Sequence, residues 1–202
     1  MPPSNALNVL QNSQDESLDT VSTSRRSFLK ISAIGAGVAF AGPTLAGPAA
    51  LLNRERILSL HAPNMGETLR MVYWTPTDGY IEESLDALSY LMRDRYNNQV
   101  KRMDTKLIDT LYALQIQMEP RQPIHVLSGY RSPETNAMMR ERSRGVARNS
   151  MHLHAKAVDI RMPDRDFNQM HRAAVSLEAG GVGRYNSSRF VHLDTGPVRR
   201  WG

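Results

Sequence analysis

The sequence predicts an α+β fold in which helices flank a small, mainly antiparallel sheet. Short runs rich in β-branched and aromatic residues lie between segments whose apolar residues recur at helical spacing. These strand and helix patterns do not alternate strictly, as they would in a parallel βαβ protein. With 41% hydrophobic residues among 202, the chain has enough apolar material for the core of one domain.

The first part of that domain predicts a hairpin followed by two helices. The runs RILSLHAP and TLRMVYWT flank the turn sequence NMGE and are typical of paired strands. Leu85, Leu88 and Leu91 then recur at helical spacing in YIEESLDALSYLMRDRY. A second helix is expected in DTKLIDTLYALQIQM, capped at its start by Asp104 and stopped by Pro120.

The second part predicts three further strands and two further helices. PIHVLSGYR is typical of a strand that breaks at Gly129, and the helix SPETNAMMRER follows, with Ser132 as N-cap and Pro133 at its first position. KAVDIRM alternates as a strand, and PDRDFNQMHRAAVSLEAGG predicts a helix between an Asp cap and a glycine stop. GVGRY and RFVHLDTG predict a final strand pair around a polar turn.

The N-terminal segment, residues 1–50, carries the features of a leader, and we assign the folded domain to residues 51–202. The first twenty or so residues of the chain are polar, and their apolar residues show no regular spacing, so we expect disorder there. Arg25 and Arg26 then lie in SRRSFLK, which closely matches the bacterial twin-arginine export signal. This match predicts export of the folded protein to the periplasm.

The apolar run behind the paired arginines is rich in Gly and Ala and is interrupted by Pro43. Such a run is a poor permanent membrane span, so we expect no stable span once the signal is removed. Cleavage is expected after Ala46 or Ala50; an uncleaved anchor helix is the alternative.

The composition restricts the chemistry of any metal site. The chain has no cysteine, which excludes disulfides, thiolate catalysis and Cys-ligated zinc and leaves nitrogen and oxygen ligands. Its formal net charge of +5 fits either a solvated basic surface or a polyanionic partner. Nucleic acid is disfavoured as that partner, because the sequence shows no aromatic stacking platform or basic helix and carries an export signal.

The stretch RNSMHLHAKAVDIRMP holds the first candidate metal ligands. His152 and Asp159 lie seven residues apart, whereas ligand pairs on a helix usually lie three or four apart. Seven suits a histidine at the end of a loop and a carboxylate on the strand that follows. On that strand Asp159 points away from Val158 and Ile160, which we expect in the core.

The last predicted strand repeats this pattern. His192 and Asp194 share one face, and Val191 and Leu193 share the other. His152, Asp159 and His192 could therefore meet as a site of two histidines and one carboxylate. Three protein ligands with a fourth position left open are the usual layout of catalytic zinc. Each residue alone is more often an ordinary strand or loop side chain; the combination predicts zinc.

SMHLHAKAVD resembles the S-x-H-x-x-G-x-A-x-D signature of the D-alanyl-D-alanine peptidase and lysostaphin-like zinc peptidases. Within that group, the segments SGYRS, SRGVA, AGGVG and FVHLDTG occur in the order found in the murein endopeptidase K family. The resemblance runs from about residue 57 to the end. It implies a Hedgehog/DD-peptidase-like fold and a zinc endopeptidase acting on peptidoglycan cross-link peptides. It assigns Zn²⁺ to His152, Asp159 and His192.

The resemblance also assigns Arg131, in SGYRS, to binding the substrate or the developing oxyanion, a role that suits a guanidinium. A surface arginine beside a helix is the alternative. Ala155 stands where the signature has glycine, and we expect a negative φ there.

The general base is open at this point. Carboxypeptidase relatives place a glutamate three residues before the last histidine, where this chain has Arg189. Asp194 is the first candidate, although it could instead orient the ring of His192. His154 is the second, unless it is a loop histidine without a role.

The rival interpretation is a zinc-bearing module of the same fold that binds peptidoglycan without cutting it. The resemblance favours an endopeptidase over a carboxypeptidase, and we expect a monomer.

Overall fold

The computed structural model describes residues 54–143 and 145–202. The predicted leader and its cleavage sites lie outside these residues. Within them, no helix combines the length and the apolar character needed to cross a membrane.

The described residues form strands and helices in a mixed order. The strands are β1 (Arg56–Ala62), β2 (Glu67–Thr75), β3 (Gly79–Tyr80), β4 (Ile124–Ser128), β5 (Ala157–Arg161), β6 (Gly181–Tyr185), β7 (Phe190–Asp194) and β8 (Arg199–Trp201). The helices are α2 (Glu82–Leu91), α3 (Thr105–Met118), α4 (Pro133–Arg142), α5 (Phe167–Ser176) and the short 3₁₀ helix η1 (Met151–His154).

One sheet joins all the described strands in the order β3-β2-β1-β4-β5-β7-β6-β8. The pairs β1–β4 and β6–β8 are parallel, and every other neighbouring pair is antiparallel. The prediction of an α+β fold with a mainly antiparallel sheet is therefore confirmed. Strands β3 and β8 and the 3₁₀ helix η1 are not evident from the sequence, because elements of two to four residues are too short to show a period.

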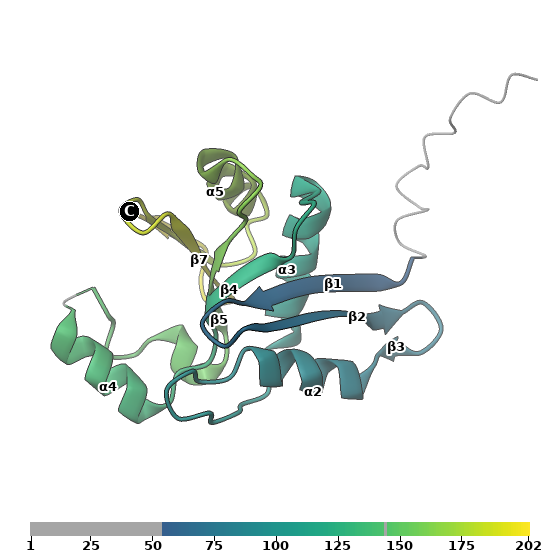
Figure 1. The fold of residues 1–202 in the computed structure, drawn as a ribbon. Helices are drawn as coiled ribbons and strands as arrows, with labels where there is room; N and C mark the ends of the chain where they lie inside the picture. The colour runs from purple at the N-terminus through teal and green to yellow at the C-terminus, as the bar shows by residue number, and fades with distance from the viewer. Residues whose placement is uncertain (1–53, 144) are drawn as a thin grey trace, which may run out of the picture. The chain divides into compact units, whose positions relative to one another are not determined.

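Helices α2, α3 and α5 share one hydrophobic core with the sheet. Leu85, Leu107 and Met170 from these helices belong to the same buried cluster as Val158 on β5 and Leu193 on β7. Helix α4 lies apart from these helices (Figure 1) and contributes little apolar surface. The face of β5 and β7 that is turned away from the core is therefore free for a site beside α4.

The predicted helix caps are present. The side chains of Asp104 and Ser132 accept backbone N–H groups at the starts of α3 and α4, and Pro133 occupies the first turn of α4. Helix α3 ends at Met118, and Glu119 caps it in a left-handed conformation (φ 47°) directly before Pro120.

Candidate metal centre

His152 reaches the site from η1. The N–H at its Nδ1 donates to the carbonyl oxygen of Gly129 at 2.6 Å, because a carbonyl can only accept. Gly129 must be a glycine, since a Cβ there would come within 2.3 Å of the backbone oxygen of Met92. This bond sets the tautomer of His152 and leaves its Nε2 unprotonated and available to a metal.

Asp159 and His192 are direct partners across β5 and β7. Their neighbours Val158 and Val191 are fully buried in the core, so Asp159 and His192 project from the opposite face. The alternation predicted from the sequence is thus present in both strands. Antiparallel register, rather than closeness in sequence, brings the two side chains together.

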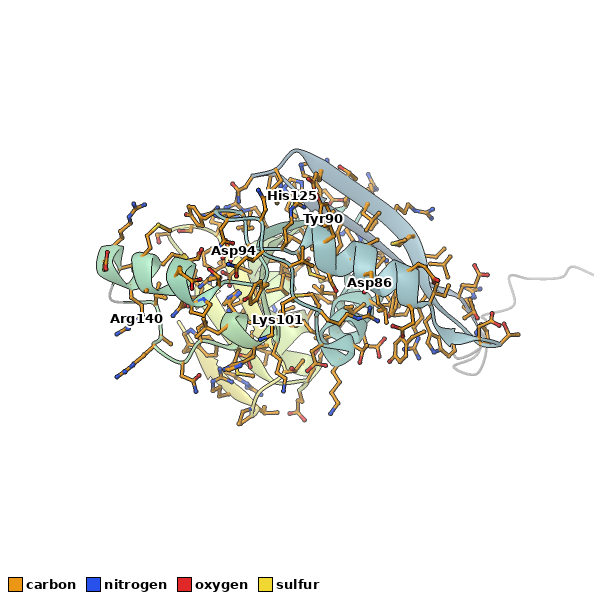
Figure 2. All side chains as sticks on the ribbon, turned by 90° about the horizontal axis from the view of Figure 1, so that it is seen from below. Asp86, Tyr90, Asp94, Lys101, His125 and Arg140 are labelled. Carbon is orange, nitrogen blue, oxygen red and sulfur yellow. The ribbon has the colours of Figure 1, made fainter. Side chains whose placement is uncertain are left out.

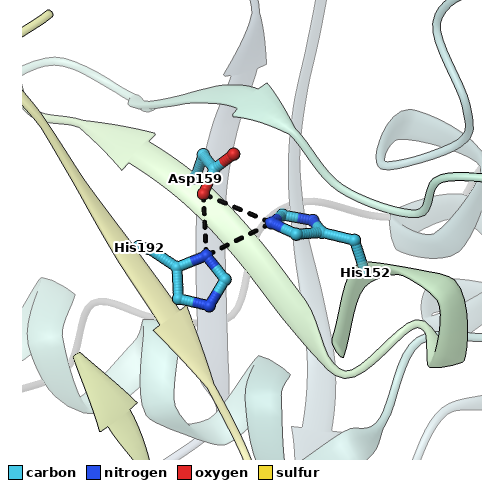
Figure 3. Close-up of side chains that lie close together, drawn as sticks. All are labelled: His152, Asp159 and His192. Carbon is cyan, nitrogen blue, oxygen red and sulfur yellow. Dashed lines mark hydrogen bonds and ion pairs between the residues drawn. The ribbon is translucent and has the colours of Figure 1, made fainter. Parts of the chain in front are cut away.

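The three predicted ligands converge (Figure 3). Nδ1 of His192 lies 2.9 Å from Oδ1 of Asp159 and 3.2 Å from Nε2 of His152, and Nε2 of His152 lies 3.3 Å from Oδ1 of Asp159. All three residues are buried. Ligands about 2.0–2.1 Å from a tetrahedral zinc ion lie about 3.3 Å from one another. Both the donor atoms and their spacing therefore fit Zn²⁺.

Asp194 lies behind His192. Its Oδ2 is 3.0 Å from Nε2 of His192, on the far side of the ring from the other two ligands. Backbone N–H groups of Gly181 and Gly196 donate to its Oδ1, and the guanidinium of Arg199 donates to both of its oxygens. A metal-binding histidine commonly donates its second N–H to such a carboxylate. Both oxygens of Asp194 are thus engaged by fixed partners.

Arg131 lies beside Asp159. Its Nε donates to Ser128 Oγ at 2.8 Å, and one terminal nitrogen donates to Oδ2 of Asp159. Its backbone N–H donates to the carbonyl of His152 at 3.2 Å, which joins the two segments that carry them. Arg131 is buried and lines the same groove as the three candidate ligands.

The three candidate ligands are electrostatically coupled. Burial alone would raise the pKa of Asp159, but His152, His192 and Arg131 outweigh it and hold that pKa well below its usual value. Burial lowers the pKa of His152, which favours the neutral, metal-binding form. Burial acts in the same direction on His192, but hydrogen bonds to Asp159 and Asp194 prevail and raise its pKa.

A groove of about 700 Å³ is lined by His152, Asp159 and His192. One wall comes from α4 and the loop behind it, and the other comes from β6, β7 and β8. The side chains of these walls include Met138, Met139, Arg142, Tyr185, Phe190 and Trp201. Asn136 on α4 donates to the carbonyl of Ala147 and so ties the loop to the helix.

The structure does not bring His154 or Arg189 into this groove. His154 is exposed on η1, where its Nε2 lies 3.1 Å from Oδ1 of Asn149. The guanidinium of Arg189 lies 5.5 Å from the centre of the Phe167 ring, on the α5 side of the sheet.

Ala155 corrects an expectation. It has φ 54°, in the left-handed region, and not the negative φ expected for a residue that replaces glycine. Ala155 ends η1, and its N–H turns back to the carbonyl of His152. The chain must reverse here to enter β5, and the left-handed conformation makes that reversal. Alanine therefore occupies the glycine conformation with a steric cost.

Sequence reasoning missed several residues that support the site. Asp94 is buried and accepts the backbone N–H groups of Ser132 and Tyr96, which anchors the start of α4 next to Arg131. Arg199 and Trp201 lie in β8, a strand too short to be predicted. Asp194, in contrast, was a candidate from the sequence, because residues two apart on a strand share a face and Asp194 follows His192 at that spacing.

Comparisons with known proteins place these features in one family. The profile described as "Peptidoglycan L,D-endopeptidase MepK" matches residues 51–201. The peptidoglycan L,D-endopeptidases MepK of Escherichia coli (strain K12) and Shigella flexneri are each 39% identical to this chain, over 91% of it and 100% of their own length. The probable MepK of Haemophilus influenzae is 38% identical, over 91% of this chain and 98% of its own. No solved structure gave a significant match.

Proposed function

Because this chain belongs to the peptidoglycan L,D-endopeptidase MepK family, we propose that it is a zinc-dependent endopeptidase that hydrolyses L,D cross-link peptide bonds in peptidoglycan. The observation that carries this proposal is the buried cluster of His152, Asp159 and His192 under an open groove. Family membership supports the reaction and the substrate, and the cluster of side chains supports the location of the active site.

Zn²⁺ would be held by Nε2 of His152, Nδ1 of His192 and a carboxylate oxygen of Asp159. When bound, zinc supplies a Lewis acid that polarises a carbonyl and lowers the pKa of its water from ~15.7 toward ~7. Gly129 accepts the Nδ1–H of His152 and Asp194 accepts the Nε2–H of His192, so Nε2 of His152 and Nδ1 of His192 are the nitrogens that would bind the metal. The side of the cluster that faces the groove is left for water and substrate.

Arg131 would stabilise the negative charge that develops on the carbonyl oxygen of the substrate. Two of its nitrogens are used by Ser128 and Asp159, which fix the plane of the guanidinium. The remaining N–H groups of this side chain are available to the groove that it lines. A prearranged donor next to the ligands is the arrangement that favours such a transition state.

Asp194 would orient His192 and would not act as the general base. His192 and Arg199 outweigh its burial and hold the pKa of this carboxyl far below its usual value. A carboxylate with so low a pKa is a weak proton acceptor at neutral pH. We assign no role to His154, since it lies outside the groove.

The groove would select substrates that carry carboxylates. Of the described arginines that line it, Arg131 pairs with Asp159 and Arg199 pairs with Asp194. Arg95 and Arg142 have no carboxylate partner among the described residues. Cross-link peptides with free diaminopimelate carboxylates would complement these two cations.

The protein would act in the periplasm after export by the twin-arginine route, as a monomer whose peptidase domain spans residues 51–202. The alignments to the relatives cover 91% of the chain, so they include Arg25 and Arg26 upstream of the peptidase domain. A folded domain that holds a metal suits this route, since it carries folded proteins.

Digestion of purified muropeptides tests the proposal. The zinc-loaded protein is expected to cut L,D cross-linked dimers and to leave D,D cross-linked dimers intact. A chelator or His152→Ala should abolish cleavage, and added zinc should restore it only in the chelated wild type. Cleavage that survives both treatments would overturn the proposed chemistry. Binding of zinc and of sacculi without any cleavage would identify a binding module instead.

A further inference from the structure

The C-terminal strand β8 meets the site described above from its outer side. It ends the order of the sheet and pairs in parallel with β6, with Gly181 opposite Arg199 and Gly183 opposite Trp201. Alternation along the strand puts Arg199 and Trp201 on one face and Arg200 on the other. The strand has three residues and therefore few backbone bonds, which the contacts of these two side chains supplement.

Arg199 binds the carboxylate of Asp194, which in turn accepts the N–H of His192. Its two terminal nitrogens reach the two oxygens of Asp194 at 3.0 and 2.7 Å, which fixes the plane of that carboxylate. The Asp194 side chain is 0% exposed, whereas that of Arg199 is 44% exposed. Arg199 is therefore the solvent-facing end of a chain of contacts that leads inward to a metal ligand.

Trp201 covers the same histidine. Its ring centre lies 5.3 Å from that of His192, and the guanidinium of Arg199 lies 5.0 Å from the Trp201 ring. Gly183 makes the approach possible, because a Cβ at that position would come within 2.5 Å of the indole. The glycine of β6 and the tryptophan of β8 thus fit together next to the ligand.

We propose that Arg199 and Trp201 act as positioning residues, a clamp that holds His192 with its Nδ1 turned toward the metal. Arg199 keeps Asp194 in place to accept the N–H at Nε2 of His192, and Trp201 blocks rotation of the ring out of the cluster. The proposal rests on the zinc site of the proposed function. It adds that the affinity of this site depends on the last strand of the chain, where no ligand lies.

Zinc affinity measured by competition with a chromophoric chelator tests the clamp without any peptidoglycan. Arg199→Ala and Trp201→Ala are each expected to weaken zinc binding about 10- to 100-fold, the range seen when support of a ligand histidine is lost. Trp201→Phe, which keeps an aromatic ring over His192, should recover most of the affinity. Arg200→Ala is the matched control, since it removes the neighbouring charge from the other face of β8 and should leave the affinity unchanged.

The absorption spectrum of the cobalt-substituted protein gives a second readout, because it reports the geometry of the ligands. It should change in the two alanine variants and remain as in the wild type for Arg200→Ala. Wild-type affinity and spectra in both alanine variants would overturn the clamp and leave the proposed function standing. Absence of zinc and cobalt binding in the wild type would overturn both. Zinc binding by a wild-type protein that shows no peptidase activity would overturn the proposed reaction and leave the clamp standing.

Discussion

Nδ1 of His192 lies 2.9 Å from Oδ1 of Asp159, and the two residues face each other across β5 and β7. The register of one antiparallel strand pair thus produces two of the three candidate ligands. A slip of one residue in this pairing would turn His192 into the core and remove the site. The candidate metal centre and the fold therefore depend on the same backbone hydrogen bonds.

Zinc affinity should fall as the pH is lowered. Ligands bind zinc in their unprotonated forms, and hydrogen bonds to Asp159 and Asp194 raise the pKa of His192 above the ordinary value near 6.5. Protons therefore compete with zinc at His192 at a higher pH than at an ordinary histidine. Competition titrations across a pH series measure this dependence. A constant affinity from mildly alkaline to mildly acidic buffer would contradict the described site.

Arg142→Ala should weaken the binding of substrates with free carboxylates. Arg142 lines the groove without a carboxylate partner among the described residues, so one exposed charge contact of about 1 kcal/mol would raise KM about fivefold. The effect should shrink in high salt and vanish with a substrate whose diaminopimelate carboxylate is amidated. Steady-state kinetics measure both.

The control for Arg142 is Arg140→Ala. Arg140 lies on the same helix (Figure 2), and its exposed side chain is not among those that line the groove. The Arg140→Ala substitution should leave KM unchanged. An equal rise in KM for both variants would show that general basicity, and not the groove, attracts the substrate.

Asp94→Asn should destabilise the fold and flatten its response to acid. Burial opposes the charge of Asp94, but Thr135, Ser132 and Tyr96 prevail and lower its pKa. A lowered folded-state pKa stabilises the protein above the unfolded pKa near 3.9, and this contribution is lost as pH falls through the folded value. Loss of bonds to a buried charged group costs about 1.5–3 kcal/mol. Urea unfolding at neutral and acidic pH measures both effects.

Asp86→Asn provides the comparison. Asp86 pairs with Arg102 on the surface, while Asp94 lies in the interior after α2 (Figure 2). An exposed pair contributes about 0–1 kcal/mol, so this variant should remain close to the wild type. Equal losses in the two variants would contradict the anchoring role of Asp94.

Substitutions of Ala155 should separate backbone strain from packing. Glycine relieves a left-handed cost of about 1–2 kcal/mol but loses a buried methyl group worth about 0.8 kcal/mol, so Ala155→Gly should stay within about 1 kcal/mol of the wild type. Ala155→Val adds a β-branched side chain at φ 54° in a fully buried position and should lose more than about 2 kcal/mol. Unfolding midpoints rank the three proteins, and a valine variant as stable as the wild type would contradict the described turn.

The strands with a strong local pattern, and the strand faces of two candidate ligands, could be predicted from the sequence. Val158 and Ile160 mark the core face of β5, and Val191 and Leu193 mark that of β7, so the faces of Asp159 and His192 follow from alternation. The helix caps at Asp104 and Ser132 follow from residue type and position.

The supporting residues could not be predicted, because their roles depend on contacts between distant segments. Gly129 is required by the backbone of Met92, and Gly183 is required by the indole of Trp201. No local sequence pattern predicts either contact. The left-handed φ of Ala155 could not be predicted either, because an alanine is expected to have a negative φ.

Zinc content of the purified protein, measured by elemental analysis on the wild type and on His192→Ala, tests the metal centre most directly. The structure predicts one zinc ion per chain in the wild type and its loss in the variant, with the variant still folded by circular dichroism. Absence of zinc from the wild type after exposure to the metal, or full retention by His192→Ala, would contradict a site built from His152, Asp159 and His192.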